Sequence, residues 1–169
     1  MDITILLIWI VLIMLTSLVP PICSAIMDLV DFKFNETIFN QPQKTSSVFG
    51  IPWQLWFNQA QGWLNKYKNR DPKQGPREYK LFGLFKGQWT QFSDAWHFFK
   101  MIGIGFNNIC RAFYIGLGIY LGSSAAIYMG TEPFGTTIWI TMAIVFLYHA
   151  FDWNITFNLF FDKILRKKS

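Results

Sequence analysis

Three long apolar segments constrain this chain more than any other feature of its sequence. They cover residues 3–30, 101–129 and 138–161. An α-helix rises about 1.5 Å per residue, so about 20 residues cross the roughly 30 Å of hydrocarbon in a bilayer. Only 15% of the 169 residues are charged, against about 25% in an ordinary globular domain. We therefore predict an all-α integral membrane protein with three transmembrane helices.

The first apolar segment resembles an anchor more than a cleaved signal peptide. A signal peptide has a positively charged start and a small-x-small cleavage site. Here the second residue is Asp2, and the first basic residue is Lys33. Proline lacks the amide hydrogen that an inner helical turn needs. We therefore expect a transmembrane helix over residues 1–30, with a kink or an end at Pro20 and Pro21.

The second and third apolar segments predict a transmembrane helical hairpin over residues 101–162. Residues 130–135, which separate the two segments, are too few for anything except a turn between antiparallel helices. Small residues recur at every fourth position of the second helix: Gly118, Gly122, Ala126 and Gly130. Such a row lets another helix approach closely. We expect it to pack against the third helix or against another subunit.

Lys and Arg lie on one side of the predicted spans. They occur in residues 31–100 and in the basic tail, residues 163–169, apart from Arg111 near the inner end of the second helix. The amino terminus and the turn carry only Asp2 and Glu132 as charged residues. Cytoplasmic loops are enriched in Lys and Arg. We therefore predict a multi-pass protein with its amino terminus outside and its carboxy terminus in the cytoplasm.

An aromatic stripe marks residues 52–67 of the cytoplasmic segment. Its apolar positions follow the i, i+3, i+4, i+7 spacing of an amphipathic helix. The residues that we expect to face the lipid interface or a partner are Trp53, Trp56, Phe57, Trp63 and Tyr67. Trp and Tyr prefer the headgroup zone, which favours a helix lying in the interface. The alternative is that the stripe packs on the protein's own cytoplasmic layer.

A basic segment overlaps the end of this stripe and covers residues 66–87. Its Lys and Arg residues are Lys66, Lys68, Arg70, Lys73, Arg77, Lys80 and Lys86. Because Pro and Gly interrupt the segment, we expect a mobile loop that faces anionic phospholipid headgroups, where each basic residue contributes about 1 kcal/mol. An acidic protein or nucleic acid is the alternative partner, although no RNA-binding motif or recognition helix accompanies the charges.

Two Asp–His pairs raise the question of an intramembrane metal site. Asp94 and His97 precede the second apolar segment, and His149 and Asp152 lie in the third. Each pair has the i, i+3 spacing that a metal-binding bundle can use. Counted from the turn at 1.5 Å per residue, the first pair lies about 53 to 58 Å away and the second about 25 to 29 Å. We therefore expect no metal. Because the sequence also contains no P-loop, no dinucleotide-binding glycine pattern and no G-x-S-x-G motif, we expect no other cofactor and no catalytic residues.

Arg111 and Asp152 are the opposite charges that the hairpin brings to a common depth, about 32 and 29 Å from the turn. A lone charge in hydrocarbon is costly, so we expect an ion pair that fixes the register of the two helices. The alternative is that Arg111 extends to lipid phosphates while Asp152 contacts water. Cys23 and Cys110 stand far apart in apolar stretches and are expected to act as small apolar side chains.

Two blocks of sequence carry a resemblance. DAWHFFKMI at residues 94–102 and FDWNITFNLFFDKILRKK at residues 151–168 resemble patterns in small uncharacterised membrane proteins of Bacteroidetes and their phages. The resemblance implies a phage-encoded, non-enzymatic structural protein of a virion membrane, with other membrane or capsid proteins as partners. The alternatives are an accessory subunit of a larger bacterial or organellar membrane complex and a holin-like pore-former. Holins usually lack a cytoplasmic segment as long as residues 31–100.

Overall fold

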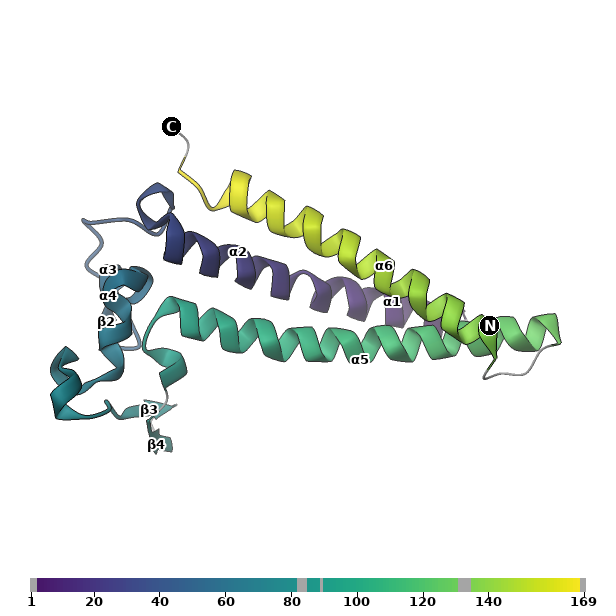
Figure 1. Cartoon of the computed structure of the whole chain (residues 1–169), viewed down its shortest axis with the longest axis horizontal. Helices are drawn as coiled ribbons and strands as arrows, with labels where there is room; N and C mark the ends of the chain where they lie inside the picture. Colours follow the sequence, from purple (N-terminus) through teal and green to yellow (C-terminus); the bar gives the residue numbers. More distant parts are fainter. Residues whose placement is uncertain (1–2, 82–84, 89, 131–134, 168–169) are drawn as a thin grey trace. The chain divides into compact units, whose positions relative to one another are not determined.

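The computed structural model describes residues 3–81, 85–88, 90–130 and 135–167, and Figure 1 shows its helices and strands. The chain divides into two compact units. The first unit, which we call the bundle, comprises Met1–Ile22 and Gly103–Phe157. The second unit, which we call the head, comprises Cys23–Ile102 and Asn158–Ser169. Each unit is described separately below.

Within the described residues, three helical segments are long and apolar enough to cross a membrane: Ile3–Phe32, Ala95–Met129 and Thr136–Ile164. They consist of α1 (Ile3–Ser17) with α2 (Val19–Phe32), of α5 (Ala95–Met129), and of α6 (Thr136–Asn158) with the π-helical segment η6 (Leu159–Ile164). The prediction of a mostly helical chain with three candidate spans is confirmed. Most of the turn expected at residues 130–135 lies outside the described residues.

The first span is interrupted at Leu18, between α1 and α2. Pro20 and Pro21 follow directly and occupy the first turn of α2. Amide groups in a first turn have no partner within the helix, so proline costs little there. The two prolines therefore mark the end of α1 and the start of a new helix.

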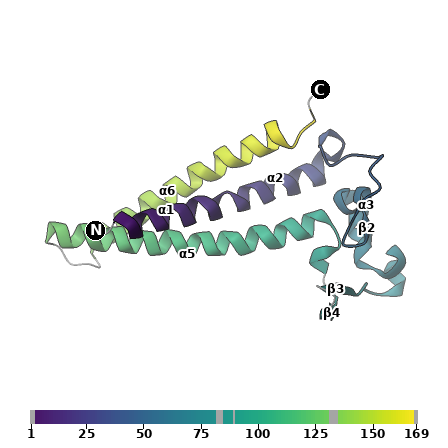
Figure 2. The same cartoon turned by 180° about the vertical axis from the view of Figure 1, so that it is seen from behind.

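In the bundle, α1, α5 and α6 lie side by side (Figures 1 and 2). Their shared core consists of Ile13, Cys110, Tyr114, Leu117 and Val145. Many other apolar side chains on these helices are exposed, among them Leu7, Trp139, Ile140 and Leu147. A water-soluble bundle would bury such side chains, whereas a bundle in hydrocarbon has no reason to. The exposed apolar surface is therefore consistent with helices that face lipid.

The row of small residues on α5 lies partly against α6. A Cβ atom added at Gly118 would come within 2.7 Å of Met142 Cγ, and one added at Gly122 would come within 2.7 Å of Ile138 Cα. Ala126 is fully buried. Gly130 differs from the other three, because it follows the last residue of α5 with φ +68° and no described atom lies within 4 Å of its added Cβ. Its role is to end the helix in a left-handed conformation, not to pack.

Besides most of α2, the start of α5 and η6, the head contains a series of short elements. In chain order they are η1 (Phe34–Glu36), β1 (Ser47–Val48), β2 (Ile51–Pro52), α3 (Trp53–Phe57), α4 (Gln59–Gly62), η2 (Trp63–Lys66), η3 (Lys68–Arg70), η4 (Pro72–Gln74), β3 (Tyr79–Leu81), β4 (Phe85–Gly87) and η5 (Thr90–Phe92). β1 pairs antiparallel with β2, and β3 pairs antiparallel with β4. These short pieces give the head its own aromatic core.

The end of the chain pairs with the start of the head. Ile38 N donates to Leu165 O at 2.9 Å, and Lys167 N donates to Glu36 O at 2.7 Å. Arg166 forms an ion pair with the Glu36 carboxylate. The arginine's hydrogen bond lowers the pKa of Glu36, and the charges of Arg166 and Lys33 lower it further. The basic tail is therefore anchored to the residues that follow α2.

Candidate functional sites

The aromatic stripe does not form the single helix expected over residues 52–67, and that prediction is wrong. Asn58 has extended backbone angles (φ −82°, ψ 99°), which end α3 and start α4 in a new direction. In a continuous helix Leu55 O would accept from the amide of residue 59. Here it accepts from the buried side chain of Asn65 at 2.9 Å, which also donates to Ser93 O at 3.0 Å. Asn65 thus stabilises the broken path.

The break in the helix buries part of the stripe. Trp56 and Phe57 are almost fully buried, and Trp56 Nε1 donates to Phe92 O at 3.2 Å. Trp53 donates through Nε1 to Phe39 O at 2.8 Å and lies under the Lys44 ammonium, 3.3 Å from its ring centroid. Trp56 and Phe57 therefore belong to the core of the head, and the partly buried Trp53 packs against Phe57. For these three residues the structure agrees with the alternative that the stripe packs on the protein's own short segments.

Trp63 and Tyr67 remain at the surface of the head. Trp63 is 41% exposed, and its ring is perpendicular to that of Tyr67 with 6.2 Å between centroids. The Lys66 ammonium lies 5.7 Å from the Trp63 ring centroid and 5.3 Å from that of Tyr67. We call Trp63, Lys66 and Tyr67 the aromatic-basic edge. An amphipathic cluster of this kind suits the headgroup zone of a bilayer.

The first half of the basic segment forms a turn whose two arms are joined by backbone contacts. Tyr67 forms a β-bridge with Pro76. Lys68 N donates to Gly75 O at 3.0 Å, and Arg77 N donates to Lys66 O at 2.7 Å. These backbone contacts hold residues 66–77 in one defined conformation.

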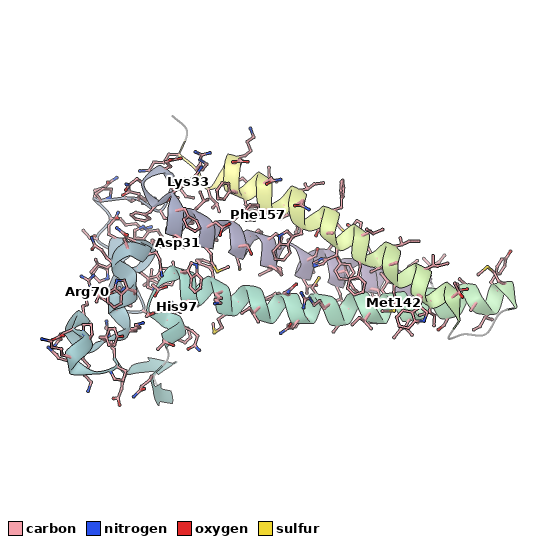
Figure 3. All side chains as sticks on the ribbon, viewed as in Figure 1. Asp31, Lys33, Arg70, His97, Met142 and Phe157 are labelled. Carbon is pink, nitrogen blue, oxygen red and sulfur yellow. The ribbon has the colours of Figure 1, made fainter. Side chains whose placement is uncertain are left out.

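Four side chains of this turn surround a concavity of about 390 Å³: Lys68, Asn69, Arg70 and Arg77. We call it the basic pocket. The other expected basic residues lie elsewhere, since Lys66 belongs to the aromatic-basic edge and Lys73 is exposed on η4. Lys80 and Lys86 are opposite each other in the β3–β4 ladder. Figure 3 labels Arg70.

Asp94 and His97 form a capping network at the start of α5. The fully buried Asp94 carboxylate accepts from His97 N at 2.9 Å and from Ser93 Oγ at 2.9 Å. Its Oδ2 lies 2.8 Å from His97 Nδ1, and Figure 3 labels His97. Asp94 therefore acts as the N-cap of α5, because its side chain binds the amide of the third helical residue.

The expected ion pair between Arg111 and Asp152 is not formed among the described residues. Arg111 is exposed on α5, whereas Asp152 Oδ2 is buried. The reason is rotational: Cys110 and Tyr114 face the core, and one residue is a 100° turn of the helix. The Arg111 side chain therefore lies on an exposed part of α5, beside the face that carries Cys110 and Tyr114.

Asp152 instead belongs to a polar cluster within the apolar bundle. The ring of His149 lies 4.8 Å from that of Tyr114, centroid to centroid. Three of the cluster's polar atoms are buried without a hydrogen-bond partner: Tyr114 Oη, His149 Nδ1 and Asp152 Oδ2. The sequence reasoning missed Tyr114, although the spacing Cys110–Tyr114–Leu117 on one face of α5 could have identified it.

No group of three or more His, Cys, Asp or Glu side chains is placed to hold a metal ion in the part of the chain that the structure describes. Cys23 and Cys110 are both free and buried. Comparison with protein family models, curated proteins and solved structures finds no match to this chain. The fold by itself therefore defines the class of protein: a mostly helical chain with three helices able to span a membrane.

Proposed function

We propose that this protein is a non-enzymatic structural component of a membrane, in which three helices anchor a head that docks on anionic phospholipid headgroups. The aromatic-basic edge carries this proposal. Trp63 and Tyr67 present apolar rings beside the Lys66 ammonium on the surface of the head. Trp and Tyr rings prefer the membrane–water interface, and a nearby Lys is attracted to anionic lipid. The aromatic-basic edge therefore combines both interactions on one surface.

The bundle supports the anchoring role. Gly118 and Gly122 let α5 approach α6 at backbone distance, which is how helices associate in lipid, where apolar burial between them contributes little. The proposed orientation has the amino terminus outside and the head in the cytoplasm, because Lys and Arg are concentrated in the head. The membrane that we propose is that of a lipid-containing phage virion, on the basis of the resemblance alone.

The docking of the head can be tested with a probe beside the aromatic-basic edge. In a background with Cys23→Ala and Cys110→Ala, an environment-sensitive fluorophore is attached to Gln61→Cys, an exposed position of α4. The full chain is placed in nanodiscs that contain lipids with a headgroup quencher. We expect quenching that is stronger with anionic than with zwitterionic lipid and is reduced by Trp63→Gln. Equal fluorescence with and without the quencher would refute docking.

The virion proposal is tested by what copurifies with the native protein. Capsid proteins in the purified assembly would support it. Respiratory or transport subunits in their place would support the accessory-subunit alternative. Loss of membrane potential followed by lysis on expression would support the pore-former and contradict a structural role.

A further inference from the structure

We infer that the basic pocket of the head binds a phosphate group, and that the ligand is a lipid headgroup ending in a phosphomonoester. The assignment of this phosphate to a lipid rests on the proposed docking of the head on the membrane. The pocket is a defined site, because Lys68, Asn69, Arg70 and Arg77 line one concavity. Three cationic side chains around one space match the charge of a phosphomonoester, which is close to −2 at neutral pH.

The pocket is formed by the folding of the turn. Lys68 and Arg70 come from η3, whereas Arg77 follows η4 on the returning arm. The β-bridge between Tyr67 and Pro76 and the backbone hydrogen bonds beside it hold the two arms together. The cations therefore stay close to one another before any ligand arrives. Mutual repulsion in that arrangement favours an anion between them.

The backbone of η3 is held in an unfavourable conformation that directs Arg70. Asn69 and Arg70 have φ values of 50° and 60°, in the left-handed region that residues other than glycine rarely adopt. The Asn69 amide donates to Gln74 Oε1 at 2.9 Å, and Arg70 Nη2 donates to Gln61 O at 3.1 Å. Arg70 Nε is buried and has no hydrogen-bond partner in the structure.

Asp71, the acidic residue between the two arms of the turn, has both carboxylate oxygens engaged within the turn. Asp71 Oδ1 accepts from Lys73 N at 2.9 Å, and Asp71 Oδ2 accepts from Gln74 Nε2 at 3.2 Å. Both carboxylate oxygens are therefore engaged in capping η4. Lys68 and Arg70 line the pocket beside Arg77, and guanidinium groups bind phosphate oxygens with two parallel hydrogen bonds where geometry allows.

A phosphomonoester should be preferred to a phosphodiester. The monoester offers three terminal oxygens and nearly two charges, whereas the diester of phosphatidylglycerol offers two oxygens and one charge. A diffuse basic surface would respond only to the density of negative charge. A preference for the phosphomonoester lipid over the phosphodiester lipid at equal surface charge therefore distinguishes a binding pocket from a diffuse basic surface.

The test uses the full chain in phosphatidylcholine nanodiscs that contain either phosphatidic acid or phosphatidylglycerol, with the surface charge matched. The measurement is the amount of each anionic lipid that remains bound per protein after extraction into detergent. We expect phosphatidic acid to be enriched, and Arg70→Gln to reduce that enrichment about tenfold, the effect of one charge-assisted hydrogen bond. Lys73→Gln is the matched control, since Lys73 is exposed in the same turn but does not line the pocket.

Lys68→Gln, at an exposed position of the pocket, gives a second variant in case Arg70→Gln does not fold, as judged by circular dichroism and size-exclusion chromatography. Equal enrichment of the two lipids, or equal losses with Lys73→Gln and Arg70→Gln, would overturn the pocket and leave head docking intact. Binding of inorganic phosphate without enrichment of phosphatidic acid would refute the proposal that the ligand is a lipid. Binding of RNA that Arg70→Gln abolishes, with no lipid enrichment, would overturn the ligand class. Failure of docking itself is detected separately, by the probe at Gln61→Cys.

Discussion

Substitution of Gly122 by alanine provides a strong test of the helix contact in the bundle. The added Cβ would lie 2.7 Å from both Cα and Cγ1 of Ile138. Ordinary carbon contacts are about 3.5 to 4.0 Å, so α5 and α6 must separate locally by about 1 Å. The Cα atom cannot move by a side-chain rotation. We therefore expect the usual cost of overpacking, about 1 to 3 kcal/mol.

Gly105→Ala is the matched control on the same helix. No described atom lies within 4 Å of a Cβ added at Gly105. Both substitutions replace glycine by alanine inside α5, and both gain about 0.5 to 1 kcal/mol of helix propensity. That gain cancels in the comparison, so the difference between the two variants reports the clash alone. Gly118→Ala should fall between them, because its nearest neighbour is Cγ of the flexible Met142 side chain.

The assay is unfolding of the full chain in mild detergent by added SDS, followed by circular dichroism. We expect Gly122→Ala to unfold at lower SDS than Gly105→Ala, with a difference in unfolding free energy of about 1 to 3 kcal/mol. Size-exclusion chromatography in mild detergent confirms that both variants start from the same state. If Gly122→Ala were as stable as Gly105→Ala, the close approach of α5 to α6 would be refuted.

Three further predictions concern individual side chains. Asn65→Ala should destabilise the head by about 2 to 4 kcal/mol, since it leaves two buried carbonyl groups without their donor, and faster amide hydrogen exchange in η2 would report it. Tyr114→Phe should be neutral or stabilising by up to about 1 kcal/mol, because the hydroxyl is buried without a partner; a clear loss in SDS unfolding would contradict this. The lowered pKa of Glu36 means that its pairing with Arg166 stabilises the tail contact above the ordinary glutamate pKa of about 4.3. That stabilisation is lost as the pH falls through the lower pKa of the folded state, so the distance between spin labels on the tail and on the segment after α2 should increase there, and Glu36→Gln should remove the pH dependence.

Features that depend on local composition and periodicity can be predicted from neighbouring residues alone. Long uncharged apolar runs predict helices wherever they occur, because each residue's backbone groups are satisfied within the same segment. The three candidate spans, the end of α1 before Pro20 and the capping of α5 by Asp94 all follow from neighbouring residues.

The contacts that each side chain makes depend on residues far away in the sequence, and local patterns do not predict them. The aromatic stripe was predicted as one helix, but Asn65 binds Leu55 O and Ser93 O, and no periodicity of residues 52–67 contains that second, distant partner. Asp152 shares a depth with Arg111 but not a face, and depth is all that counting along a helix provides. The basic pocket likewise requires both arms of a turn to meet, since cations seven and nine residues apart become neighbours only when backbone hydrogen bonds between the arms bring them together.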